Sequence, residues 1–337
     1  MSQTPSIARA TRLLPPDAAG IAEAAALLRS GRLVAFPTET VYGLGADATD
    51  ARAVAALYAA KGRPQFNPLI AHVTGLEAAQ AEGALDPTAQ ALARAFWPGA
   101  LTLVVPAARG AKVCDLARAG LDSVALRVPV HPLARSLIEA VGRPVAAPSA
   151  NRSGHVSPTE APHVMADLET RIDAVIDGGS TAIGLESTII ACLGGKPRLL
   201  RSGGVTREAV ERVVGPLLDV PDEDGPERAS PLSPGLLASH YAPAAAVRLD
   251  ARDIRPGEAA LLFGRTRPRG VASAVAALNL SASGDLAEAA ANLFAHLRAL
   301  DARLAGLNGA GIAVAPIPSE GLGEAINDRL RRAAAER

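Results

Sequence analysis

The sequence predicts an α/β protein made of a larger and a smaller unit. Short apolar runs typical of buried strands alternate with stretches of helical spacing along the chain. The length of 337 residues suggests two domains of about 150 residues each. An acidic, proline-rich stretch at 218–234 has the composition of an exposed linker. We therefore expect a twisted mixed sheet with a concave face before this stretch and a second α/β unit after it.

In the first unit, capping residues and apolar spacing predict a series of helices. The first begins at Asp17 and ends before the stop signal Gly31. The second begins after the capping side chain of Asp50. Further helices are expected at 87–96, from the Ser157-Pro158-Thr159 stretch, and from the cap Thr206 to about Val214.

Strands of the first unit are predicted where short apolar runs end at proline, glycine or a polar turn. These stretches are 33–36, 69–73, 101–105, 123–128, 145–147, 174–177, 184–190 and 199–201.

The second unit begins near Val247 and is expected to be Rossmann-like. Strands are predicted at 258–263 and 311–315, with helices at 285–304 and 323–335. We expect a catalytic domain at 1–216, a linker that acts as a lid at 217–245, and a C-terminal domain at 246–337.

Composition excludes several kinds of site. Lys+Arg and Asp+Glu number 34 each, so the formal net charge is zero and favours neither non-specific nucleic-acid binding nor an anionic membrane. The two cysteines, Cys114 and Cys192, form no C-x-x-C pair, and the six histidines show no H-E-x-x-H spacing. A disulfide framework and a thiolate metal site are therefore not expected.

The N-terminus lacks the apolar core of a signal peptide, and no segment is long and apolar enough to span a bilayer. We expect a cytoplasmic protein with no direct membrane contact.

The stretch LVAFPTETVYGLG at 33–45 is the first candidate site. A buried strand should end at Pro37, which has no N–H for a sheet ladder. Two hydroxyls and the carboxylate of Glu39 follow, and Gly43 and Gly45 are expected to let the backbone turn sharply and approach a ligand. Open α/β sheets bind ligands beyond the carboxyl ends of their strands. The alternative is an ordinary strand-to-helix connection.

A dinucleotide site is excluded at this stretch. Residues 43–48 fit G-x-G-x-x-A, but that fingerprint requires an acidic residue roughly 20 positions further on. No Asp or Glu occurs from Ala51 to Leu76. We therefore expect no nicotinamide cofactor.

Cations mark a second candidate site. Lys61 and Arg63 lie two residues apart on a loop with Gly and Pro, where they suit a polyanion such as a polyphosphate. The alternative is a solvated helix C-terminus, which also favours cations. Arg127 lies within an apolar strand and needs an anion partner, because an unpaired buried charge is costly.

Taken together, the motifs resemble one family. In chain order they are PTETVYGLGADA, KGRPQFNPLIAHV, WPGALTLVV, VALRVP, AAPSAN, SPT, GLESTI and LLRSGG. This series resembles the YrdC-domain family, and SPGLLASHYAP with a second α/β unit is similar to the long form of that family. The resemblance covers the first unit nearly end to end, and the second unit more weakly.

The resemblance implies an ATP-dependent nucleotidyltransferase. Such enzymes join L-threonine, bicarbonate and ATP into threonylcarbamoyl-AMP and pyrophosphate, with Mg²⁺ on the phosphates. The product is passed to a complex that modifies tRNA, so strong tRNA binding by this chain is not expected.

The resemblance also implies residue roles, with Lys61 and Arg63 as catalytic cations. L-Threonine would be surrounded by Thr40, His72, Arg127, Ala147 and Ser187. ATP would be held by Lys61, Arg63, Asn67, Ser123, Ser149, Asn151, Ser157, Arg201 and Tyr241.

Two other functions compete with this one. A carbamoyl-adenylate former of the hydrogenase-maturation type shares the YrdC domain, but it should carry acylphosphatase-like and zinc-finger regions that two cysteines do not support. A non-catalytic RNA-binding module is disfavoured by zero net charge and 3% aromatic residues, since single-stranded RNA is held by basic grooves and stacked rings.

Overall fold

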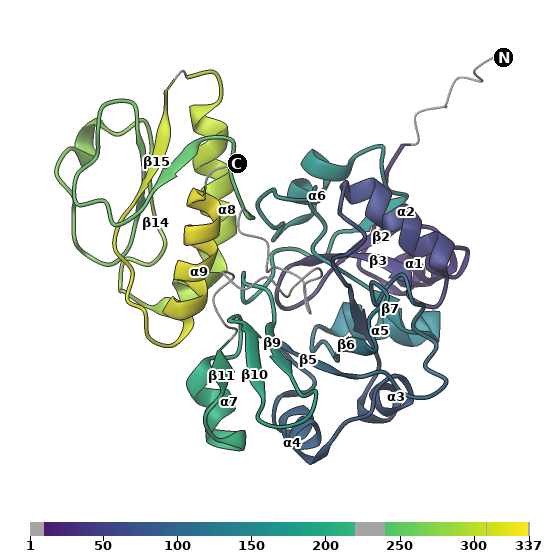
Figure 1. Ribbon diagram of the computed structural model, residues 1–337. Helices are drawn as coiled ribbons and strands as arrows, with labels where there is room; N and C mark the ends of the chain where they lie inside the picture. The colour runs from purple at the N-terminus through teal and green to yellow at the C-terminus, as the bar shows by residue number, and fades with distance from the viewer. Residues whose placement is uncertain (1–9, 220–239, 308, 336–337) are drawn as a thin grey trace.

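The computed structural model describes residues 10–219, 240–307 and 309–335 (Figure 1). Within these residues the chain builds an 11-stranded sheet and a separate 4-stranded sheet, each covered by helices. The prediction of a mixed-sheet α/β unit followed by a smaller Rossmann-like unit is therefore confirmed. No helix in the described part of the chain is long and apolar enough to cross a membrane.

The larger sheet mixes parallel and antiparallel neighbours in the order β1-β8-β2-β3-β7-β4-β6-β5-β9-β10-β11. Its strands are β1 (Arg12–Leu14), β2 (Val34–Pro37), β3 (Tyr42–Asp47), β4 (Ile70–His72), β5 (Leu101–Pro106), β6 (Ser123–Arg127), β7 (Val145–Ala146), β8 (Ala174–Ile176), β9 (Thr188–Ala191), β10 (Arg198–Arg201) and β11 (Leu218–Asp219). Its helices are α1 (Ala18–Arg29), α2 (Ala51–Lys61), α3 (Leu76–Glu82), α4 (Pro87–Phe96), α5 (Pro132–Val141), α6 (Ala161–Leu168) and α7 (Arg207–Val214).

The smaller sheet is entirely parallel in the order β12-β15-β13-β14. Its elements are β12 (Ala246–Arg248), β13 (Ala259–Leu262), the 3₁₀ turn η1 (Val271–Ser273), β14 (Ala277–Asn279), α8 (Leu286–Leu304), β15 (Gly311–Val314) and α9 (Leu322–Ala334). Helices α8 and α9 lie on the side of this sheet that faces the larger unit (Figure 1).

Side-chain caps define several helix starts as the sequence predicts. A capping oxygen accepts a hydrogen bond from a first-turn backbone N–H at Asp17, Asp50, Asp86, Thr206 and Asp285. The helix predicted from the Ser157 stretch is α6, but it begins only at Ala161, and the buried Ser157 side chain donates to Glu186 instead of capping the helix. Helices α3 and α5 were not predicted.

The predicted glycine-spaced loop after Pro37 is wrong. Strands β2 and β3 form an antiparallel hairpin in which Val34 pairs with Gly45 and Pro37 with Tyr42. Neither Gly43 nor Gly45 has a positive φ. A Cβ at Gly45 would lie 2.9 Å from Phe36 Cε1 and 3.0 Å from Val34 O, so glycine is needed here for close packing within the sheet.

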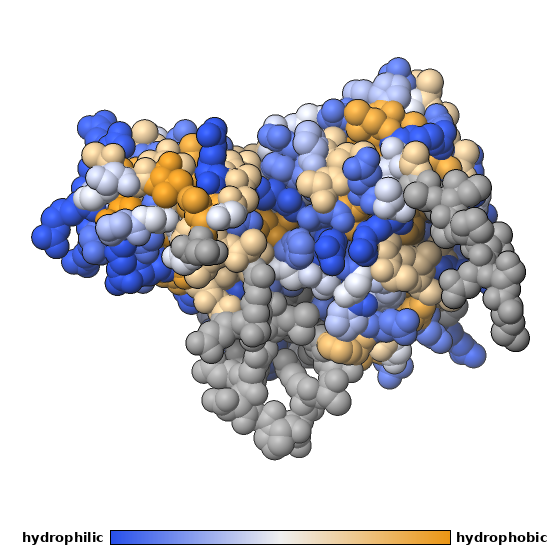
Figure 2. Space-filling view, turned by 90° about the horizontal axis from the view of Figure 1, so that it is seen from above, coloured by the Kyte–Doolittle hydropathy of each residue, from blue (hydrophilic) through white to orange (hydrophobic). Residues whose placement is uncertain are grey.

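The two units share a hydrophobic core. Helix α8 buries Leu293, Phe294 and Leu297 completely, and the same cluster includes Val41 and Leu185 of the larger unit. On the face seen in Figure 2, hydrophobic residues form only small patches among hydrophilic ones. The large apolar side chains of this cluster are buried, and part of that burial joins the units.

Ion pairs between the units surround this shared core. Arg298 of α8 pairs with Asp167 of α6 at 2.8 Å, and Glu324 of α9 pairs with Arg207 of α7 at 3.0 Å. A third pair joins α9 to the functional pocket and is described below.

The packing at Gly45 yields a stability prediction. Gly45→Ala should lower the free energy of unfolding by roughly 1–3 kcal/mol, because the added Cβ overpacks the β2–β3 hairpin against Phe36 and a backbone oxygen. Urea denaturation measures this change. Gly75→Ala is the control, since a Cβ at Gly75 meets no atom within 4 Å. Equal losses in the two variants would contradict the packing account.

Candidate functional site

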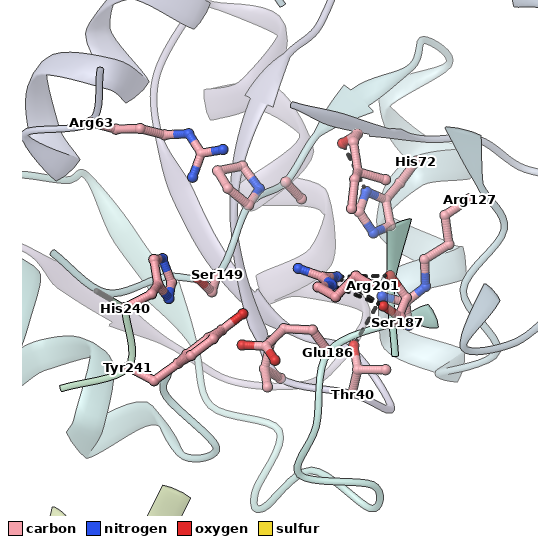
Figure 3. A pocket seen from close by; sticks show the side chains of 14 residues that line it. Thr40, Arg63, His72, Arg127, Ser149, Glu186, Ser187, Arg201, His240 and Tyr241 are labelled. Carbon is pink, nitrogen blue, oxygen red and sulfur yellow. Dashed lines mark hydrogen bonds between the residues drawn. The ribbon is translucent and has the colours of Figure 1, made fainter. Parts of the chain in front are cut away.

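A polar pocket forms where the ends of several central strands meet the turn of the β2–β3 hairpin (Figure 3). Strand β4 contributes His72, β6 ends at Arg127 and β10 ends at Arg201. The complete lining is Thr40, Val41, Arg63, Ile70, His72, Arg127, Ala147, Pro148, Ser149, Glu186, Ser187, Arg201, His240 and Tyr241. Short strands that end together thus gather residues from widely separated motifs.

Arg127 lines the pocket and forms a buried ion pair with Glu39. Its Nη2 donates to Glu39 Oε1 at 2.5 Å, its Nη1 to Thr40 Oγ1 at 2.9 Å, and its Nε to Gly99 O at 3.2 Å. Burial would raise the pKa of Glu39, but the charge and hydrogen bond of Arg127 outweigh burial and lower that pKa. The anion partner that the sequence requires for Arg127 is therefore Glu39.

Two other arginines in the pocket wall pair with no carboxylate of the described chain. Arg201 donates through Nε and Nη2 to Ser187 O at 3.1 and 2.9 Å. Arg63 donates to the backbone oxygens of Asn67 and Pro68. Burial lowers the pKa of both guanidinium groups, to about 10 for Arg63. Arginine nevertheless keeps its charge in proteins. Two buried cations without anionic partners favour an anionic ligand.

Lys61 lies behind the pocket lining. Its Nζ donates to the backbone oxygens of Ser149 and Asn151, and this contact joins the end of α2 to the turn after β7. Burial, assisted by the charge of Arg63, lowers the pKa of Lys61 well below its usual value. Lys61 therefore shapes the loop that carries Ser149 into the pocket.

Four further predicted ATP residues, Asn67, Ser123, Asn151 and Ser157, also lie outside the lining. Ser157 Oγ donates to Glu186 Oε1 at 2.5 Å, and Ser123 begins β6. Asn67 and Asn151 are buried, and each has a side-chain oxygen without a hydrogen-bond partner in the described structure. The structure thus brings nine of the predicted residues to the cavity, namely Thr40, Arg63, His72, Arg127, Ala147, Ser149, Ser187, Arg201 and Tyr241. Lys61, Asn67, Ser123, Asn151 and Ser157 are not part of that lining.

Sequence reasoning missed two polar residues of the pocket lining, Glu186 and His240. Glu186 stands inside the recognised motif GLEST, but it was given no role, and Glu39 was placed in the first candidate site without its partner Arg127. His240 precedes the predicted Tyr241 and lines the pocket with it. The predicted strand at 184–190 begins only at Thr188, which leaves Glu186 and Ser187 on a loop beside the cavity.

His240 and Tyr241 close the pocket from the side of the second unit. Their rings meet edge to face with centroids 4.0 Å apart, and Tyr241 stacks on Phe294 of α8 at 5.6 Å. Tyr241 has a φ of 63°, a left-handed conformation that only tight surroundings maintain in a non-glycine residue. Burial lowers the pKa of His240 to about 3, so this ring is neutral.

The closed pocket is small. Its cavity of about 40 Å³ has room for only a few water molecules, at about 10–15 Å³ each. A ligand of nucleotide size requires the covering residues to move. Within the described residues, no group of three or more His, Cys, Asp or Glu side chains gathers as a metal site would require.

Two family profiles match the chain. Residues 26–203 match the Sua5, YciO and YrdC family, described as telomere recombination, and residues 205–335 match the C-terminal domain of threonylcarbamoyl-AMP synthase.

Relatives and a solved structure match nearly the whole chain. The threonylcarbamoyl-AMP synthase of Bacillus subtilis is 42% identical over 94% of this chain and 93% of its own. The Pyrococcus abyssi synthase is also 42% identical, over 93% of this chain and 94% of its own. The crystal structure of P. abyssi Sua5 complexed with L-threonine has a TM-score of 0.86 and 38% identity, and covers 96% of this chain and 97% of its own.

The Glu39–Arg127 pair makes stability depend on pH. Glu39→Gln should lower the free energy of unfolding at neutral pH by a few kcal/mol, on the order of 3, because it leaves the buried Arg127 charge uncompensated. Folding lowers the pKa of Glu39, so its contribution is full above the unfolded-state pKa and is lost as pH falls through the folded-state value.

Chemical denaturation of the wild type and Glu39→Gln at several pH values measures this difference. The gap between the two proteins should shrink on acidification. Glu169→Gln, at an exposed carboxylate, is the control and should show no comparable gap. A gap of constant size at every pH would refute the role assigned to the pair.

Proposed function

The chain belongs to the threonylcarbamoyl-AMP synthase family, and we propose that its pocket joins L-threonine, bicarbonate and ATP into threonylcarbamoyl-AMP with release of pyrophosphate. The single observation that carries this assignment to the site is the pair of buried arginines, Arg63 and Arg201, that pair with no described carboxylate. Such cations suit the polyphosphate of ATP.

For L-threonine we propose the part of the pocket around Arg127. Thr40, Ala147 and Ser187 are small residues around the cavity, and they suit a short side chain with one hydroxyl and one methyl group. The substrate carboxylate would approach the guanidinium of Arg127, which Glu39 already orients. Burial, and next the charge of Arg127, lowers the pKa of His72 to about 3, so a neutral imidazole would face the substrate.

For ATP we propose contact with Arg63, Ser149, Arg201 and Tyr241 of the same lining. The predicted ATP residues outside the lining, Lys61, Asn67, Ser123, Asn151 and Ser157, would hold these in place or reach the nucleotide once the pocket opens. The unpartnered buried oxygens of Asn67 and Asn151 support this, because buried acceptors usually find donors.

Mg²⁺ would enter with ATP. The pocket carboxylates already have partners, since Glu39 is bound to Arg127 and Glu186 to Ser157 and Arg329. The donor set therefore fits an ion held by phosphate oxygens and water better than one held by a protein cage. When bound, Mg²⁺ would neutralise charge on the leaving pyrophosphate.

The chemistry requires positioning and charge rather than a covalent nucleophile. The carbamate of threonine attacks the α-phosphate, and negative charge builds up on five-coordinate phosphorus. Arg63 and the buried Lys61 would stabilise this charge in a site with little water. N-carboxythreonine is labile in water, so His240 and Tyr241 would exclude water while it reacts.

We propose that residues 217–245 act as a lid between a catalytic domain at 1–216 and a C-terminal domain at 246–337. The small closed cavity supports opening and closing at His240 and Tyr241. Most of the proposed lid, at 220–239, lies outside the described residues. The product would pass to a tRNA-modifying transferase in the cytoplasm, without strong tRNA binding by this chain.

The reaction itself is the first test. Purified protein with Mg²⁺, ATP, L-threonine and labelled bicarbonate should release pyrophosphate and form a labelled adenylate, which mass spectrometry of a quenched reaction detects. The most specific expectation is that pyrophosphate release depends on threonine, because a simple ATPase would not need threonine. Pyrophosphate release indifferent to threonine, or an unlabelled adenylate, would mean that the substrates are wrong.

The cations are the second test. Lys61→Met and Arg63→Met should each lower kcat by on the order of 100-fold, with a smaller change in the KM for threonine, because their charges act mainly as phosphorus becomes five-coordinate. Arg52→Met, an exposed arginine on the same helix α2, is the matched control and should behave as wild type. Wild-type rates in both variants would leave these cations with no catalytic role.

A further inference from the structure

Arg329 reaches the pocket wall from the second unit. It lies on α9, its side chain is fully buried, and its Nε donates to Glu186 Oε2 at 2.9 Å across 143 residues of sequence. Its Nη1 donates to Asp328 Oδ2 at 2.7 Å. Its guanidinium carbon lies 5.1 Å from the centroid of the Tyr241 ring, within range of a cation–π contact.

Glu186 shares the pocket with a second arginine. Both of its carboxylate oxygens are engaged, Oε1 by the hydroxyl of Ser157 and Oε2 by Arg329. It nevertheless lines the same cavity as Arg201 (Figure 3). Burial would raise the pKa of Glu186, but Arg329 and then Arg201 lower it, so both cations act on this one carboxylate.

Arg201, like Arg63, has no carboxylate partner among the described residues, and it is the one that shares the cavity wall with Glu186 most directly through Ser187. Among the described residues its hydrogen bonds run from Nε and Nη2 to Ser187, Nη1 makes none, and it forms no ion pair with a carboxylate. Without Arg329, the buried Glu186 carboxylate would have Arg201 as its strongest remaining cation. A Glu186–Arg201 pair would then cancel the charge that an anionic ligand needs.

We propose that Arg329 is a positioning residue that holds the Glu186 carboxylate away from Arg201, so that Arg201 stays available to the phosphates of ATP. The second unit then has a defined role in the reaction. Its helix α9 supplies the positive charge that binds Glu186, and Arg201 is left free to bind the substrate. The choice of ATP as the anion rests on the function proposed above.

Equilibrium binding of ATP, measured by calorimetry without threonine or bicarbonate, tests this role. Arg329→Met should raise the Kd for ATP by about 10- to 100-fold, the effect expected when one charged contact is lost. Arg329→Gln keeps an N–H donor at the position of the Nε that meets Glu186, but its side chain is shorter and carries no charge. It should shift the Kd in the same direction, and it serves if Arg329→Met does not fold.

The rescue variant separates positioning from simple docking of the two units. In the double variant Arg329→Met/Glu186→Gln, the neutral amide cannot capture Arg201, so the Kd for ATP should return to within a few-fold, about threefold, of wild type. Glu324→Gln is the matched control on the same helix, because it breaks the other α9 ion pair, with Arg207, away from the pocket. It should bind ATP as wild type does.

The outcomes are distinguishable. Unchanged ATP binding in both Arg329 variants would overturn the inference. A weaker affinity for ATP in Arg329→Met that the added Glu186→Gln change does not restore would also overturn it. The same holds if Glu324→Gln weakens ATP binding equally, because Arg329 would then only help to dock the two units. If the wild type binds ATP and makes product while these results are negative, the proposed function stands without the inference. If the wild type binds no ATP, both fall.

Discussion

The pocket depends on how buried positive charge is compensated. Four arginines approach it, and water cannot solvate them, so each needs a partner of opposite sign. Glu39 compensates Arg127, and Glu186 with Asp328 compensates Arg329. Arg63 and Arg201 have backbone oxygens but no carboxylate of the described chain. The uneven distribution of carboxylates thus creates a site with a net positive charge inside a protein whose formal net charge is zero.

The same distribution depends on docking between the units. The core around α8 includes Val41 and Leu185 from the larger unit, and Tyr241 lies between Phe294 and Arg329. Apolar burial brings α9 close enough for an arginine to reach Glu186. A loosely tethered second unit would leave Glu186 to pair within the pocket, so the packing of the two units and the charge of the site are coupled.

Sequence patterns predict strands β2 and β4 correctly but fail for strand β3. The apolar run before Pro37 and the strand carrying His72 were both predicted, because alternation and proline stops act locally. Gly43 and Gly45 were assigned to a turn, although they lie in a strand. Glycine meets two demands, positive φ and close approach, and only the neighbouring Phe36 shows which one applies.

By itself the sequence determined the α/β class and the order of its motifs, because apolar runs and turn residues act locally. The resemblance of those motifs to a known family then named most of the residues around the cavity. Only the tertiary structure decided which charges meet. Arg127 was expected to need an anionic partner, and that partner is Glu39. Lys61 was expected to contact the ligand, and it lies behind the pocket lining. Arg329 could not be connected to Glu186 from any local pattern, because electrostatic energy depends on distance and burial in space rather than on separation along the chain.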